Sequence, residues 1–95
     1  MDINEFQKLM KQLYFSRDAE RGQEKTLSWL EDEVQELREA LKEENMQEAE
    51  KEFADVLAWL ASLANVVGID LEKAARSKYD NKCPKCKLNP CDCPF

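Results

Sequence analysis

The chain has 95 residues, enough for one domain, with 43% hydrophobic and 36% charged residues. It carries 20 Asp or Glu against 14 Lys or Arg, a net charge of −6. We therefore expect no nucleic-acid polymer as a partner, because neutralising phosphates requires a basic surface. No apolar run is long enough to span a membrane, and the first residues do not resemble a signal peptide, so we expect a cytoplasmic protein without a membrane partner.

The first predicted element is a helix over residues 2–14, where apolar residues recur at helical spacing. Asp2 and Glu5 have the pattern of a capping box at its start. Residues 15–25 are polar and interrupted by Gly22, and we interpret them as a loop. A second interpretation is a cationic flap that closes on phosphate groups, because this stretch contains Arg17, Arg21 and Lys25.

Residues 26–67 predict a central antiparallel helical hairpin, with a polar break at residues 44–46. Each half has an apolar stripe, and we expect the two stripes to face each other. Gly68 is suited to end the hairpin, and a shorter helix is expected over residues 70–79, with Leu71, Ala74 and Ala75 facing inward. The stripes consist of Leu30, Val34, Leu37 and Leu41 in the first half, and Ala49, Phe53, Val56, Leu57, Leu60 and Ala64 in the second.

Two pairs of acidic residues lie beside these stripes. At about 100° per residue, Glu33 and Glu36 lie about 70° and 130° from the first stripe. Glu52 and Asp55 lie about 80° and 140° from the second, in the same rotational sense. Antiparallel helices then place both pairs on one side of the hairpin, where a divalent cation would relieve their repulsion. The alternative is a solvated acidic surface, because acidic residues are abundant in this chain.

The tail over residues 82–95 differs in composition, because it contains all four cysteines. The Cys-Pro-Lys-Cys spacing is typical of a zinc knuckle, and four thiolates would complete a structural zinc site. Disulfides and free reduced thiols are the alternatives. The four residues are Cys83, Cys86, Cys91 and Cys93.

The acidic segments resemble the MazG-like nucleoside triphosphate pyrophosphohydrolases, within the all-α NTP pyrophosphatase group. The signature of that family is ExxE, a gap, and ExxD. Here it is Glu33 to Glu36, then fifteen residues, then Glu52 to Asp55. The resemblance covers about residues 2–81, which we take as the domain that precedes the tail.

The resemblance implies a helical bundle completed by assembly into a homodimer or homotetramer. It also implies hydrolysis of NTPs or dNTPs to the monophosphate and pyrophosphate, as in clearance of the nucleotide pool. The four acids would then bind Mg²⁺, with Mn²⁺ as a substitute, and Glu33 or Glu36 would accept a proton. A Lys-x-x-Asn pattern at the end of the last helix, which often contributes to triphosphate binding, matches Lys78 and Asn81.

The tryptophans fall on the same flank as the acids. Trp29 and Trp59 could contact a substrate base or a second subunit, and we include Trp59 with Arg21 and Lys25 as candidate substrate-binding residues. Two alternatives remain for the function. One is phosphoribosyl-ATP pyrophosphatase, which has similar acidic helices, and the other is a non-enzymatic interaction module stapled by zinc.

Overall fold

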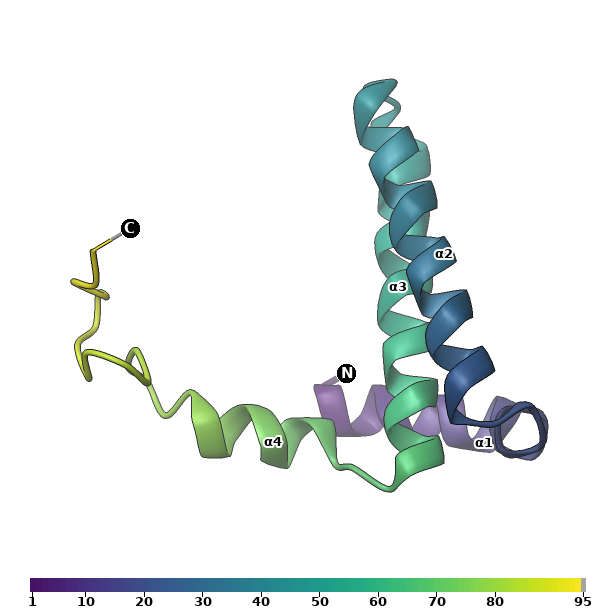
Figure 1. Cartoon of the computed structure of the whole chain (residues 1–95), viewed down its shortest axis with the longest axis horizontal. Coiled ribbons are helices and arrows are strands. Elements are labelled where there is room, and N and C mark those ends of the chain that lie inside the picture. Colours follow the sequence, from purple (N-terminus) through teal and green to yellow (C-terminus); the bar gives the residue numbers. More distant parts are fainter. Residues whose placement is uncertain (95) are drawn as a thin grey trace.

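The computed structural model describes residues 1–94, so Phe95 of the predicted tail lies outside the described residues. It contains α1 (Ile3–Arg21), α2 (Gln23–Lys42), α3 (Met46–Val67) and α4 (Leu71–Lys78). Figure 1 shows α2 and α3 side by side as a hairpin, with α1 lying across its foot. The predicted all-α fold with a helical hairpin is confirmed.

The turn of the hairpin lies where the polar break predicted it. Glu44 has a positive φ of 55°, which reverses the chain between α2 and α3. The Asn45 side chain then accepts a hydrogen bond from the Glu48 backbone N–H at 3.1 Å, capping the first turn of α3. At the other end of α3, Gly68 has a φ of 74°, a left-handed conformation that glycine adopts without steric penalty.

The prediction of a loop over residues 15–25 is wrong. Helix α1 continues to Arg21, and α2 begins at Gln23 after a single residue, Gly22, with a φ of 87°. The segment before Gly22 contains Ala, Glu and Arg, which favour helix, so one glycine suffices to turn the chain. Consequently no loop exists there to close as a flap, and Thr26 is fully buried inside α2 rather than at its start.

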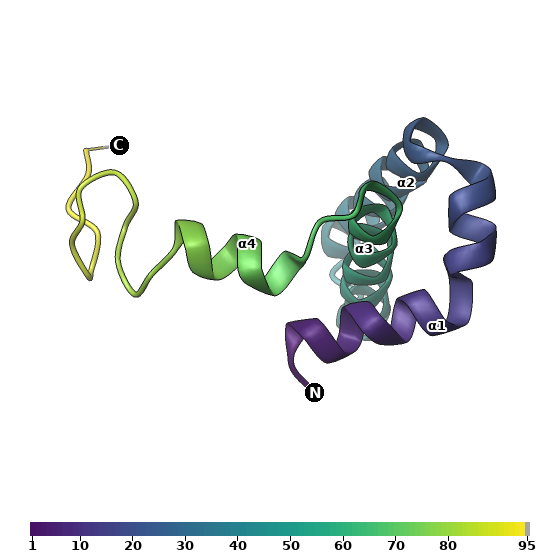
Figure 2. The same cartoon turned by 90° about the horizontal axis from the view of Figure 1, so that it is seen from below.

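Gln7 fastens α1 to the corner between α3 and α4. Its amide group donates hydrogen bonds to Asn65 Oδ1 at 3.0 Å and to the Ile69 carbonyl at 2.7 Å. Its Oε1 accepts from the Leu71 backbone N–H at 2.9 Å. A buried amide thus satisfies the backbone of a corner that would otherwise lack partners, and α1 packs chiefly against α3 (Figure 2).

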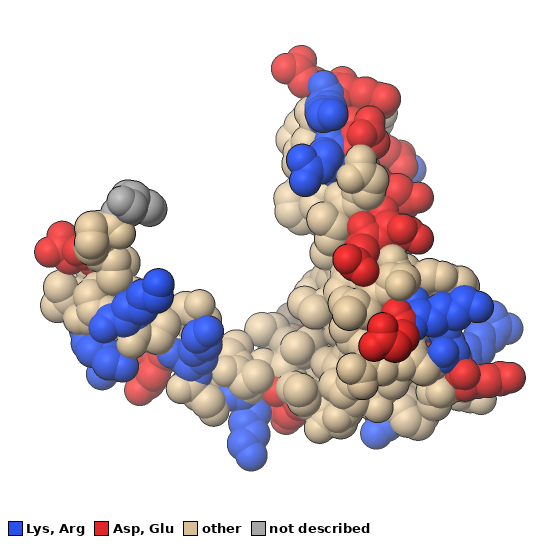
Figure 3. All heavy atoms as spheres, viewed as in Figure 1, with Lys and Arg blue, Asp and Glu red and all other residues tan. Residues whose placement is uncertain are grey.

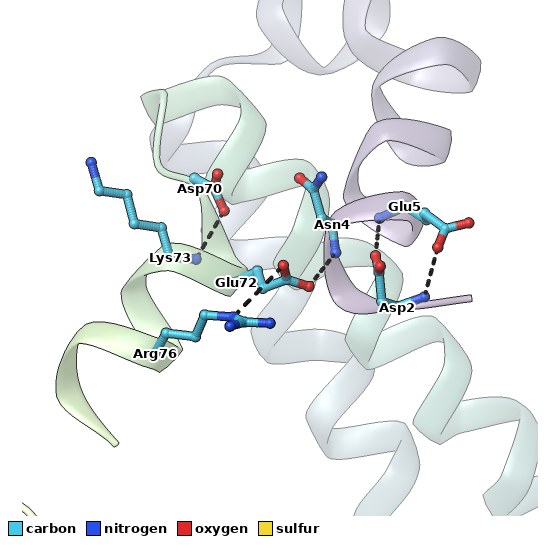
Figure 4. A network of polar contacts seen from close by, with 7 residues as sticks. All are labelled: Asp2, Asn4, Glu5, Asp70, Glu72, Lys73 and Arg76. Atoms are coloured by element: carbon cyan, nitrogen blue, oxygen red, sulfur yellow. Dashed lines mark hydrogen bonds and ion pairs between the residues drawn. The ribbon is translucent and has the colours of Figure 1, made fainter. Parts of the chain in front are cut away.

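The first turns of α1 and α4 lie close together (Figure 4). The predicted capping box of Asp2 and Glu5 is present, and Asp70 caps α4 through the Lys73 backbone N–H at 3.0 Å. The Asn4 backbone N–H donates to Glu72 Oε1 at 3.4 Å, which links the two helix starts. These contacts orient the beginning of α4 only.

The predicted apolar stripes are only partly buried: Ala49 and Ala64 are buried, and Leu30, Leu37 and Val56 are half-buried. Among residues 1–94, the buried apolar side chains are Met10 and four alanines, which lets α2 and α3 approach closely. Five other large residues of the stripes point outward with 40% to 57% of their surface exposed, namely Val34, Leu41, Phe53, Leu57 and Leu60. We call these five residues the apolar face.

Helix α4 leaves the bundle. The axes of α3 and α4 are bent by 96° at their junction, so α4 and the tail run away from the hairpin (Figures 1 and 2). Ala74 and Ala75, which we expected to face inward, are exposed. Within residues 1–94 no single helix has the length and apolar character of a membrane span, although α3 and α4 taken together reach both.

Candidate active site

Three carboxylates converge between α2 and α3. Glu33, Glu36 and Glu52 each offer a carboxylate oxygen, and these atoms lie within 4.8 Å of one another. The ExxE spacing puts two of them on one face of α2, and the antiparallel partner helix brings the third. In Figure 3 acidic side chains line one edge of the hairpin.

This cluster is partly withdrawn from water. Glu52 is buried, Glu33 is half-buried, and each keeps one Oε2 atom without a hydrogen-bond partner. Burial raises the pKa of Glu33 to about 7, with further contributions from hydrogen bonding and charge repulsion by Glu36. Burial and the charge of Glu36 also raise the pKa of Glu52. Unpartnered buried carboxylate oxygens are the donor set that a hard divalent cation needs.

Asp55, the fourth predicted acid, lies between this cluster and a neighbouring pocket. Its charge contributes to the raised pKa values of Glu33 and Glu52, so it lies close to both. It also lines a pocket of about 290 Å³ formed by α1, α2 and α3. Asp55 therefore lies both beside the acidic cluster and in the lining of the pocket.

Two tryptophan rings line the pocket, and the positively charged side chain of Arg21 packs against both. The rings of Trp29 and Trp59 meet edge to face, with centroids 5.2 Å apart. The Arg21 guanidinium lies 4.6 Å from the centroid of Trp29 and 4.8 Å from that of Trp59. Its Nη1 donates to the buried Asp18 Oδ1 at 2.7 Å, while Asp18 Oδ2 has no partner. The pocket is thus lined by two aromatic rings, the Arg21 side chain and the Asp18 carboxylate, whose buried Oδ2 has no partner.

The family model of the MazG nucleotide pyrophosphohydrolase domain matches residues 21–87, which is more than half of the chain. The chain belongs to the MazG family. The match includes both acidic pairs and all of α2, α3 and α4. A search of curated proteins found no match.

Not every residue predicted for the MazG site lies at the cluster. Lys25 is beside the pocket, with its Nζ 5.8 Å from the Trp29 ring. Lys78 and Asn81 are at the far end of α4, which runs away from the hairpin, and neither lines the pocket. The structure therefore does not bring the Lys-x-x-Asn pattern to the acids of the same chain.

The sequence did not reveal two buried polar residues, of which Asp18 lines the candidate pocket. Asp18 and Thr26 are both inside the protein, and each has a side-chain oxygen without a partner. The available signal was the i,i+3 pairing of Asp18 with Arg21, which is meaningful only on a helix. Interpreting residues 15–25 as a loop hid that signal.

The cysteines form a second cluster at the end of α4, far from the acids (Figure 1). All four thiols are free, and their Sγ atoms lie within 4.8 Å of one another. Backbone hydrogen bonds from Asp92 and Leu88 lower the pKa of Cys86 to about 6. Hydrogen bonds to neighbouring thiols raise the pKa of Cys93 to about 11.

Proposed function

We propose that the protein hydrolyses nucleoside or deoxynucleoside triphosphates to the monophosphate and pyrophosphate, in the presence of Mg²⁺ or Mn²⁺. The observation that carries the proposal is the convergence of three carboxylates, two of them with an unpartnered buried oxygen, beside an aromatic pocket. Membership of the MazG family supports the reaction class. We place this activity in the cytoplasm, acting on the nucleotide pool.

The acids fit a divalent cation. Glu33, Glu36, Glu52 and Asp55 supply only oxygen donors, which suit Mg²⁺ and Mn²⁺ better than softer metals. A bound cation would neutralise phosphate charge and make water a better nucleophile. The four carboxylates would hold the cation beside the reacting phosphate, and Glu33 or Glu36 would accept the proton that the attacking water loses.

The aromatic pocket is the proposed base site. It shares Asp55 with the acids, so a nucleotide whose phosphates meet the carboxylates extends its base toward Trp29 and Trp59. Planar bases stack on such rings and on guanidinium planes. Asp18 lines the same pocket, and its buried Oδ2 has no partner, so a base N–H group that reached this oxygen would find a hydrogen-bond acceptor.

The phosphate-binding part of the site comes from a second copy in this proposal. Lys78 and Asn81 lie at the end of α4, away from the acids of their own chain. The apolar face leaves large side chains in water that a homodimer would cover. We therefore propose a homodimer, or a tetramer built from it, in which Lys78 of the partner subunit contacts the triphosphate.

A pyrophosphate-release assay tests the proposal. The panel contains the canonical NTPs and dNTPs and phosphoribosyl-ATP, each with Mg²⁺, Mn²⁺ or EDTA. We expect metal-dependent release from at least one triphosphate, and Asp55→Asn to reduce turnover at least about 100-fold, because a hard anionic ligand is lost. Glu39→Gln is the matched control, because the Glu39 side chain is exposed on the same hairpin and accepts a hydrogen bond from Gln35 at 3.1 Å.

Each other result has a defined meaning. Hydrolysis of phosphoribosyl-ATP alone would assign the protein to that reaction instead. Asp55→Asn turnover equal to that of the parent would show that the site is misassigned. Absence of both hydrolysis and divalent-cation binding at the acids would favour a non-enzymatic interaction module.

A further inference from the structure

The arrangement of the four cysteine sulfurs matches a metal-thiolate tetrahedron. The Sγ atoms of Cys83 and Cys93 are 3.7 Å apart, and those of Cys86 and Cys91 are 3.9 Å apart. Four sulfurs at about 2.3 Å from a central Zn²⁺ lie about 3.8 Å from one another along the edges of a tetrahedron. The sulfurs are therefore spaced as ligands of one ion.

The backbone around the sulfurs is folded as a tight knuckle. The Cys83 N–H donates to the Leu88 carbonyl at 2.9 Å, and the Lys87 N–H donates back to the Cys83 carbonyl at 2.8 Å. Lys87 has a φ of 65°, so the chain reverses directly after Cys86. The turn places the first two sulfurs on the same side as the two that follow.

Backbone amides also point at the sulfurs. The Asp92 N–H donates to Cys86 Sγ at 3.4 Å, and the Cys93 N–H donates to Cys91 Sγ at 3.3 Å. Hydrogen bonds of this kind around ligand sulfurs orient the ligands and delocalise thiolate charge. Lys82, Lys85 and Lys87 lie in the same segment and offset the net −2 charge of a Zn²⁺ ion with four thiolates.

Among the described residues after α4, no apolar core explains why this segment is folded. Beyond α4 the described residues have no helix or strand, and those that are partly buried are Cys83, Pro84, Cys86 and Cys93. Three of these four are cysteines, so the interior of the segment is made of sulfur. A segment this short without a core requires a crosslink or a metal to hold one conformation.

We propose that Cys83, Cys86, Cys91 and Cys93 bind one Zn²⁺ as a closed structural site, separate from the acidic cluster. Four soft sulfur donors select Zn²⁺ over Mg²⁺, and a complete set of four protein ligands leaves no position for substrate. The folded segment extends back to the residues just after α4, because Asn89 Nδ2 donates to the Asn81 carbonyl at 2.8 Å. The ion therefore orders the segment that follows Lys78.

Metal analysis of the purified, reduced full-length chain tests this site. We expect about one zinc per chain after Zn²⁺ reconstitution and desalting. The double variant Cys91→Ser with Cys93→Ser should fall below about a tenth of that value, since two of four ligands are lost. Asp92→Asn, within the same segment, and Glu33→Gln, in the acidic cluster, are matched controls that should retain the zinc.

A second measurement keeps the test decisive if the cysteine variant misfolds. Co²⁺ substituted into the parent chain should give the visible spectrum of a tetrahedral tetrathiolate complex, and Zn²⁺ should displace it. Circular dichroism should show that the double variant keeps its helices, because the bundle lies elsewhere. Zinc retained by the double variant, zinc lost from Glu33→Gln alone, or a Co²⁺ spectrum without thiolate bands would each overturn the proposal.

Discussion

Buried side-chain oxygens without partners mark the candidate site at the scale of single residues. Glu33 and Glu52 each have one such oxygen, and so do Asp18 in α1 and Thr26 in α2. A buried polar atom without a partner is destabilising, and an ordered water, an ion or a ligand can supply the missing partner. Glu33 and Glu52 were predictable from the ExxE and ExxD pattern. Asp18 and Thr26 were not, because their burial depends on how α1 packs against the hairpin.

The raised pKa of Glu33 predicts a stability that depends on pH in the metal-free protein. Its pKa is about 7 in the folded chain, against an ordinary value of 4.5. Between these values the folded state holds a proton that the unfolded state has released, so stability falls as pH rises through this window. Above about pH 7 this contribution becomes constant. Thermal melting in EDTA from pH 4.5 to 8 should show the decline.

Glu33→Gln is the matched variant for that experiment, because it keeps the shape of the side chain and cannot ionise. We expect its melting temperature to decline less than that of the parent over the same window. A divalent cation should restore the parent at neutral pH, because it binds the ionised acids of the folded state. Equal slopes for parent and variant would contradict the assignment.

Trp59 makes a prediction about substrate binding. If the base stacks on this ring, Trp59→Ala should raise KM about 10-fold or more, since stacking contributes about 1–3 kcal/mol. The kcat should change less, because the carboxylates remain. Trp59→Phe keeps a stacking surface and should lie near the parent in steady-state kinetics. A KM unchanged in Trp59→Ala would exclude the pocket as the base site.

At the scale of helices, the capped ends and the turn of the hairpin were predictable, whereas the end of α1 and the start of α2 were not. The caps formed by Asp2, Asn45 and Asp70 and the stop at Gly68 depend on local side-chain chemistry that sequence states directly. The extension of α1 to Arg21 was missed, because polar helix-forming residues have no apolar period to reveal them.

The Gln7 contacts predict that this side chain holds α1 against the corner of α3 and α4. Gln7→Ala leaves the Leu71 N–H and the Ile69 carbonyl without their partner, so it should lower the free energy of unfolding by about 1–3 kcal/mol. Gln12→Ala, on an exposed position of the same helix, should stay within about 0.5 kcal/mol. Urea unfolding followed by circular dichroism measures both. Equal midpoints for the two variants would show that these bonds contribute nothing.

At the scale of the whole molecule, the chain alone has an incomplete core. Helical periodicity identifies apolar stripes on α2 and α3, but it does not say which of their residues the chain itself buries. Within one chain the alanines meet, and the apolar face remains exposed. A pattern read from one chain cannot distinguish its own interior from an interface between copies.

The apolar face therefore predicts self-association. We expect a dimer or larger species by light scattering at micromolar concentration, and Leu57→Glu to shift the mass toward the monomer, since it would bury a charge. Met46→Glu, at a more exposed apolar position near the tip of the hairpin, is the control that should keep the parent mass. A monomeric parent would remove the basis for a shared site.

The 96° bend directs α4, and with it Lys78, away from the acids of its own chain. The proposal that Lys78 acts in the partner's site can therefore be tested by mixing two inactive variants. Asp55→Asn lacks an acid and Lys78→Ala lacks the phosphate contact, so each variant alone should be inactive. In a two-fold symmetric dimer that exchanges subunits, an equal mixture forms mixed pairs with one intact composite site. Turnover should recover to about a quarter of the parent value. If each chain instead used its own Lys78, mixing would restore nothing.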